Sequence, residues 1–109
     1  MKEIIAYIKP HRLTKVTMAL QKIKGLGGIS VAKVRGFGRR REDDPHRPVV
    51  DDLMDFAEYI KIEIFCPDEL TEELISIINK AASTGLRGDG KIFVSDVERG
   101  FRIGNGEII

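Results

Sequence analysis

The sequence has a single cysteine, no tryptophan and no apolar run long enough to span a bilayer. Because one thiol, Cys66, cannot form a disulfide within the chain, it suits a reducing compartment, and we predict a cytoplasmic protein without membrane insertion. The CxxC and HExxH motifs are absent, which leaves no common metal or redox motif. Lys2 and Glu3 lead straight into a strand-like segment, so no signal peptide is predicted.

The chain also has little net charge. Its 109 residues include 18 Lys and Arg against 17 Asp and Glu, a formal net charge of +1. This balance gives no electrostatic reason to expect nucleic acid as a partner, and we predict none. A hydrophobic content of 42% and a charged content of 32% are typical of a soluble globular protein, and the length suits a single domain over residues 1–109.

Hydrophobic spacing predicts strands over residues 1–9, 29–37, 59–66 and 91–97, and helices over residues 13–24 and 70–82. Asp68 is a candidate cap for the second helix, and the imperfect alternation of the second strand leaves room for a β-bulge. The order β-α-β-loop-β-α-β is that of the α+β ferredoxin-like fold, a split βαβ with a four-stranded antiparallel sheet. Both helices can cover one sheet face. The other would carry Tyr7, Phe65 and Phe93, and an exposed apolar face predicts a homo-oligomer.

Residues 83–91, between the second predicted helix and the last predicted strand, are rich in glycine. Backbone N–H groups in such turns can form a concave anion site, to which Arg87 and Lys91 would add positive charge. The GxxxxGK[ST] spacing of a P-loop is absent. An ordinary helix-to-strand turn would use the same glycines, so spacing alone leaves both readings open. For Asp89 we predict a turn and hydrogen-bonding role rather than that of a general base.

Residues 38–55 break every helical and strand pattern. They hold the basic run Arg39–Arg41, the acidic run Glu42–Asp44 and two prolines. A loop of this length in a compact domain is usually functional, and its charges would select a partner; a solvated insertion is the alternative. A metal site formed by His46 and the acidic run on the same loop is a further alternative.

Four segments together carry a resemblance to a known family. They are IKPH at 8–11, VRGFGR at 34–39, TGLRGDGKIFV at 84–94, and FRI at 101–103 followed by Gly106-Glu107. In order and spacing they resemble the PII nitrogen-regulatory signal-transduction family over nearly the whole chain. The resemblance implies a homotrimer of ferredoxin-like subunits that bind adenine nucleotide (ATP, ADP or AMP) in clefts between subunits. It also implies an effector loop, here about residues 38–55, that docks on a regulated target such as a membrane transporter or an enzyme. The protein itself would be a regulator and not an enzyme.

The same resemblance implies which residues bind the nucleotide. Ile8 and Glu63 match positions near the adenine and ribose, and Arg102 matches a phosphate-binding arginine supplied by the neighbouring subunit. The phosphate-binding loop and the base of the effector loop contribute the remaining positions, namely Gly36, Phe37, Gly38, Arg39, Arg40, Thr84, Gly88, Asp89, Gly90 and Lys91.

The chain departs from the family at three positions of this site. Tyr59 stands where the family has a lysine, Gly104 where it has a second C-terminal arginine, and Arg40 where it has a glutamine that contacts magnesium and 2-oxoglutarate. Loss of two cations removes charge-assisted contacts, and arginine offers no carbonyl to a magnesium ion. We therefore predict that sensing of Mg²⁺-ATP with 2-oxoglutarate is weakened or lost.

The effector loop lacks the family's modification sites. No tyrosine lies between Phe37 and Tyr59; the uridylylated tyrosine of the family aligns with Asp52, and a neighbouring modified serine aligns with Val50. We predict control by ligand binding alone. The sequence is similar to divergent PII-like proteins, including a group associated with heavy-metal efflux transporters. The alternative function is a metal-responsive ferredoxin-like trimer without nucleotide sensing, in which His11 is a further candidate ligand.

Overall fold

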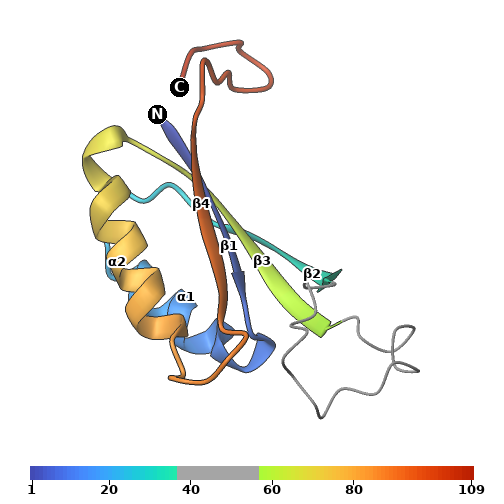
Figure 1. Ribbon diagram of the computed structural model, residues 1–109. Helices are drawn as coiled ribbons and strands as arrows, with labels where there is room; N and C mark the ends of the chain where they lie inside the picture. Colours follow the sequence, from blue (N-terminus) through green and yellow to red (C-terminus); the bar gives the residue numbers. More distant parts are fainter. Residues whose placement is uncertain (37–56) are drawn as a thin grey trace.

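The computed structural model describes residues 1–36 and 57–109 (Figure 1). The predicted effector loop lies outside the described residues, and with it Phe37, Gly38, Arg39 and Arg40. In chain order the elements are β1 (Lys2–Ile8), the 3-10 turn η1 (Pro10–Arg12), α1 (Leu13–Gln21), β2 (Ser30–Gly36), β3 (Ala57–Cys66), the 3-10 turn η3 (Asp68–Leu70), α2 (Thr71–Ala82) and β4 (Gly90–Asp96).

The strands form one antiparallel sheet in the order β2-β3-β1-β4, and both helices cover the same face of it (Figure 1). The predicted ferredoxin-like α+β fold is thereby confirmed. β1 pairs with β3 from Lys2↔Cys66 to Ile8↔Ile60 and with β4 from Lys2↔Asp96 to Ile8↔Gly90. No helix within residues 1–36 and 57–109 has the length and apolar character needed to cross a bilayer.

The β2–β3 pair extends beyond the end of β1. β2 pairs with β3 without interruption from Ser30↔Glu63 to Gly36↔Ala57, so the β-bulge considered for this strand is absent. Since β1 ends opposite Ile60, the last rungs at Gly36 and Ala57 project about 10 Å past it. A long side chain near this part of β3 can reach across the end of β1, as Tyr59 does.

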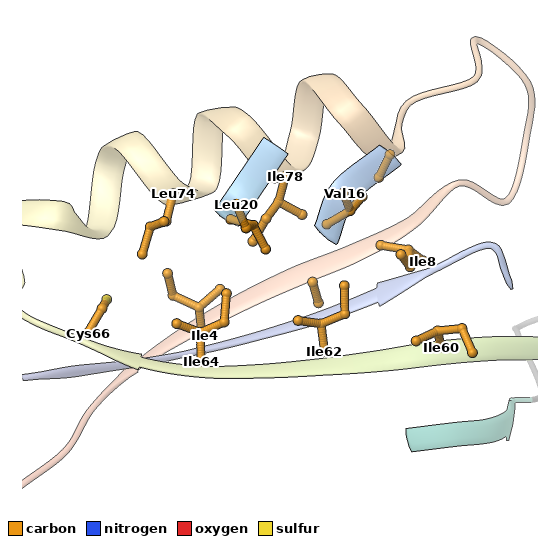
Figure 2. Packing of buried hydrophobic residues seen from close by; sticks show 12 residues of the cluster. Ile4, Ile8, Val16, Leu20, Ile60, Ile62, Ile64, Cys66, Leu74 and Ile78 are labelled. Atoms are coloured by element: carbon orange, nitrogen blue, oxygen red, sulfur yellow. The ribbon is translucent and has the colours of Figure 1, made fainter. Parts of the chain in front are cut away.

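The core lies between the helices and the sheet. Alternate residues of β1 and β3 face the helices, as their period-two spacing predicts (Figure 2). Each strand thus buries a continuous apolar row against the two helices, which is the main stabilising contact of the fold. The side chains of this core labelled in Figure 2 are Ile4, Ile8, Val16, Leu20, Ile60, Ile62, Ile64, Cys66, Leu74 and Ile78.

The opposite sheet face carries the aromatic residues expected there. Phe65 and Phe93 are 49% and 53% exposed, and Tyr7 contacts Phe93 edge-on, with ring centroids 6.3 Å apart. Tyr7 and Phe93 lie in register with the outward positions of β1 and β4. These rings are apolar area that a second copy of the chain would bury, which is the basis of the oligomer prediction.

The start of α2 differs from its prediction. Asp68 makes no side-chain cap, because Pro67 leads into the turn η3 before α2 begins at Thr71. The Asp68 carboxylate instead accepts a 2.8 Å bond from the amino group of Met1. That hydrogen bond and the charge of the ammonium lower the pKa of Asp68 below its ordinary value. The cap prediction is therefore wrong.

The packing of α1 predicts a contrast between two of its residues. Leu20 is 1% exposed, whereas Met18 is 58% exposed. Leu20→Ala is expected to lower the free energy of unfolding by about 2–5 kcal/mol, since it removes buried methyl groups and leaves a cavity. Met18→Ala should change it by less than about 0.5 kcal/mol. Urea unfolding at a fixed protein concentration measures both, and equal effects would contradict this packing.

Candidate functional site

The loop between α2 and β4 is closed by its own side chains. Asp89 accepts a hydrogen bond from the backbone N–H of Thr84 at 2.9 Å through Oδ2 and another from the Thr84 hydroxyl through Oδ1. The Thr84 hydroxyl oxygen in turn accepts the backbone N–H of Leu86 at 3.1 Å. Residues 84–89 therefore form a ring closed by hydrogen bonds among its own residues.

Lys9 ties this ring to the end of β1. Its Nζ lies 3.2 Å from Asp89 Oδ1 and 3.3 Å from Thr84 Oγ1. The bonds from the Thr84 hydroxyl and backbone N–H, followed by Lys9, lower the pKa of Asp89 to about 2. Asp89 is thus an anion whose two oxygens are engaged within the loop. This bears out the turn and hydrogen-bonding role expected for it.

Arg12 fixes the other end of the loop. Its guanidinium donates from Nε and Nη2 to the carbonyl oxygen of Ala81, at 3.0 and 2.8 Å. Ala81 belongs to the last turn of α2, where carbonyls lack intrahelical partners. Arg12 and Lys9 therefore brace both ends of the loop from the segment that follows β1. Neither role is predictable from local sequence patterns, and the only sequence signal for Lys9 is its place in the IKPH segment.

Gly90 is required where the loop enters β4. Its φ is +121°, and a Cβ built on it would lie 1.7 Å from the carbonyl oxygen of Tyr7. Gly85 and Gly88 also have positive φ, of 78° and 77°, but neither has backbone within 4 Å of a built Cβ. The close approach to β1 thus singles out Gly90.

The structure brings together most of the predicted phosphate-binding residues. Thr84, Gly88, Asp89 and Gly90 lie in the loop, and Lys91 is the first residue of β4 to lie on the open sheet face, opposite Tyr7. A 530 Å³ cavity between β4 and α2 reaches this loop at Asp89 and Gly90. The loop thus offers backbone turns and a lysine at one end of the sheet.

Three other predicted residues lie outside the loop itself. Ile8 pairs with Gly90, but it is only 1% exposed and its side chain belongs to the core. Glu63 lies on the open face of β3, 3.9 Å from Lys61 and about 10 Å along the strands from the Ile8 end. Gly36 ends β2, where a Cβ built on it would lie 3.5 Å from the Tyr59 ring.

Arg102 lies at the opposite end of the sheet. β4 runs seven residues, about 20 Å, from the loop to the tail that carries this arginine (Figure 1). The tail forms a turn closed by the Phe101↔Ile108 bridge, and the Arg102 N–H donates to the Glu107 carbonyl at 2.8 Å. Residues 101–103 form no strand beyond this bridge. One chain does not bring Arg102 to its own glycine loop.

Comparison with known proteins identifies the family. The family model for nitrogen regulatory protein P-II matches residues 1–107. The chain belongs to this family. It is 46% identical over 107 residues to the nitrogen regulatory protein P-II of Bradyrhizobium diazoefficiens, covering 98% of this chain and 95% of that protein. It is 45% identical to that of Rhizobium meliloti and 42% identical to nitrogen regulatory protein P-II 1 of Escherichia coli, with the same coverage.

The family model and the relatives share the name nitrogen regulatory protein P-II, which places the chain in a family of nitrogen regulators.

Within residues 1–36 and 57–109, no three His, Cys, Asp or Glu side chains gather as metal ligands. His11 lies exposed in η1, and His46, Asp43 and Asp44 fall outside the described residues. Among the described residues, no cluster of side chains supports the metal-responsive alternative.

The Asp89 ring predicts a pH dependence of stability. Because the folded pKa of Asp89 is about 2 and its ordinary value is 3.8, its contribution is complete above pH 4 and is lost as the pH falls through 2. Asp89→Asn should therefore be less stable than wild type at pH 6, and the difference should vanish near pH 2. Urea unfolding across this range tests it. Glu98→Gln, which alters an exposed carboxylate, is the control and should show no such trend.

The two loop glycines provide a matched pair. Gly85→Ala should destabilise the protein by about 1–2 kcal/mol, the cost of a left-handed alanine. Gly90→Ala carries a comparable backbone cost and also a clash with the Tyr7 carbonyl, so we expect at least ~2 kcal/mol more. Thermal unfolding of the two variants measures the difference, and equal losses would show that β1 yields at this contact.

Proposed function

We propose that this P-II protein is a homotrimeric regulator that binds an adenine nucleotide in clefts between subunits. Through the effector loop, residues 38–55, it would signal to a target protein such as a membrane transporter or an enzyme. Because this segment contains no tyrosine, control would come from the ligand and not from uridylylation. A cytoplasmic location is part of the proposal, supported by one buried free thiol, Cys66.

Three features of the glycine loop support the proposal that it binds phosphate. Thr84 and Asp89 hold the loop by internal hydrogen bonds, which would lower the conformational entropy lost on binding. Lys91 adjoins the loop on the open face. Asp89 is occupied by internal hydrogen bonds, which supports binding in preference to catalysis by this carboxylate.

One observation carries the shared cleft: the glycine loop and Arg102 lie at opposite ends of the same chain. If both contact one nucleotide, the arginine must come from a second subunit. The exposed Phe65 and Phe93 on the open sheet face supply apolar area for the required contact between copies. A closed ring of three copies would then contain three equivalent clefts.

The ligand would be one with low phosphate charge. Tyr59 and Gly104 stand at two positions where the family has cations, and Arg40 cannot ligate magnesium as a glutamine does. We therefore propose that AMP or ADP binds at least as well as ATP, with little dependence on Mg²⁺ or 2-oxoglutarate.

Calorimetry with AMP, ADP and ATP, with and without Mg²⁺ and 2-oxoglutarate, tests binding directly. We expect about one nucleotide per subunit, and Lys91→Ala and Arg102→Ala should each weaken it roughly 10- to 100-fold, as loss of a charge-assisted bond would. Tight ATP binding that requires 2-oxoglutarate would contradict the proposed ligand preference.

Mixing the two variants tests the shared cleft. If Lys91→Ala and Arg102→Ala subunits are unfolded together and refolded at equal amounts, about a quarter of the clefts should contain both native residues. Calorimetry should then recover that fraction of high-affinity sites. Refolding each variant alone is the control. No recovery in the mixture would place both residues in one chain's site or outside the site altogether.

A further inference from the structure

Tyr59 occupies a junction between three parts of the molecule. It lies near the start of β3, on the face opposite the buried Ile60. Its ring rests on the end of β2, since a Cβ built on Gly36 would lie 3.5 Å from Cδ2 and 3.8 Å from Cε2. Its hydroxyl donates to the carbonyl oxygen of Gly88 in the glycine loop, at 3.4 Å.

The sheet itself does not make this connection. β1 separates β3 from β4, which places these strands about 10 Å apart. β1 ends opposite Ile60, however, so Tyr59 lies just past its last rung. The phenol therefore crosses the end of β1 and reaches the loop that precedes β4. It links that loop to the strand ends on either side of residues 37–56.

The bond to Gly88 has a consequence for anion binding. In a planar trans peptide the carbonyl of Gly88 and the N–H of Asp89 point in opposite directions. A phenol that holds this carbonyl therefore also fixes the direction of the Asp89 N–H. Gly88 has a φ of +77°, and glycine allows this peptide to rotate more freely than other residues would. The orientation of one amide in the loop thus depends on Tyr59.

We infer that Tyr59 is a positioning residue that couples the glycine loop to the ends of β2 and β3. Its hydroxyl orients the Gly88–Asp89 peptide for a phosphate group, and its ring transmits any shift of that peptide to Gly36. This inference rests on the proposed nucleotide binding and adds the route by which an occupied loop alters the strand ends. Tyr59→Phe removes the hydroxyl and keeps the ring. Tyr7→Phe is the matched control, because Tyr7 also lies on the open face but contacts Phe93.

The sequence offers a selective NMR experiment. Arg-Gly pairs occur at three places, 35–36, 87–88 and 99–100. Labelling arginine carbonyls with ¹³C and glycine amides with ¹⁵N therefore selects the amide signals of Gly36, Gly88 and Gly100. These report on the strand end, the glycine loop and the start of the tail. The probe ligand is ADP, with AMP and ATP in parallel titrations.

In wild type and Tyr7→Phe, ADP should shift both Gly88 and Gly36. In Tyr59→Phe, Gly88 should still shift, the Gly36 shift should fall by at least about half, and calorimetry should show about 3- to 10-fold weaker ADP binding. A Gly36 shift that is absent from wild type, or unchanged in Tyr59→Phe, would overturn the inference and leave the proposed function intact. No Gly88 shift with any of the three nucleotides would overturn both. Unfolding of Tyr59→Phe in urea separates lost stability from lost coupling.

Discussion

The pairing of β1 on both of its edges determines where the candidate site lies. Its inward side chains, Ile4, Ala6 and Ile8, fill the centre of the core, and its two ladders align β3 and β4. Where β1 ends, Lys9 and Arg12 emerge beside the glycine loop. The same strand that organises the core therefore delivers the two cations that brace the loop.

The loop that we propose binds phosphate is built around an anion of its own, Asp89. Asp89 neutralises Lys9 and accepts two bonds from Thr84, so the carboxylate acts as an internal support for the turn. A bound phosphate would need donors that this carboxylate does not use, namely further backbone N–H groups and Lys91. This division of roles accounts for an acidic residue in a loop that is expected to bind a negatively charged ligand.

Much of the fold follows from local patterns. Ile60, Ile62, Ile64 and Cys66 alternate along β3 and are all buried, as predicted. The sequence of β2 suggests a bulge that is absent, because β2 is an edge strand with apolar residues on both faces. Val31 lies on the helix side yet is 51% exposed, and Val34 lies on the open side opposite Tyr59. Apolar residues on both sides of a poorly covered strand mimic a break in its alternation.

The residues that hold the glycine loop in place cannot be predicted from local sequence patterns. Glycine spacing and family resemblance located the loop, but Lys9 and Arg12 contact it from 75 and 69 residues away. No periodicity connects such distant positions, because their proximity is a product of sheet topology. In the sequence, Tyr59 stands out only as a replacement of the family's lysine. Its position beside Gly36 and its hydrogen bond to Gly88 depend on β3 extending past β1.

The pairing of the first strand with the last also affects how the chain is made. Lys2 is opposite Asp96, so the sheet cannot be completed on the ribosome until β4 has emerged. Until then the outer edge of β1 has no partner strand. Contacts this distant in sequence form slowly, because a long loop must close before they become favourable. Nascent chains of this protein are therefore expected to depend on chaperones more than a helical bundle of equal length would.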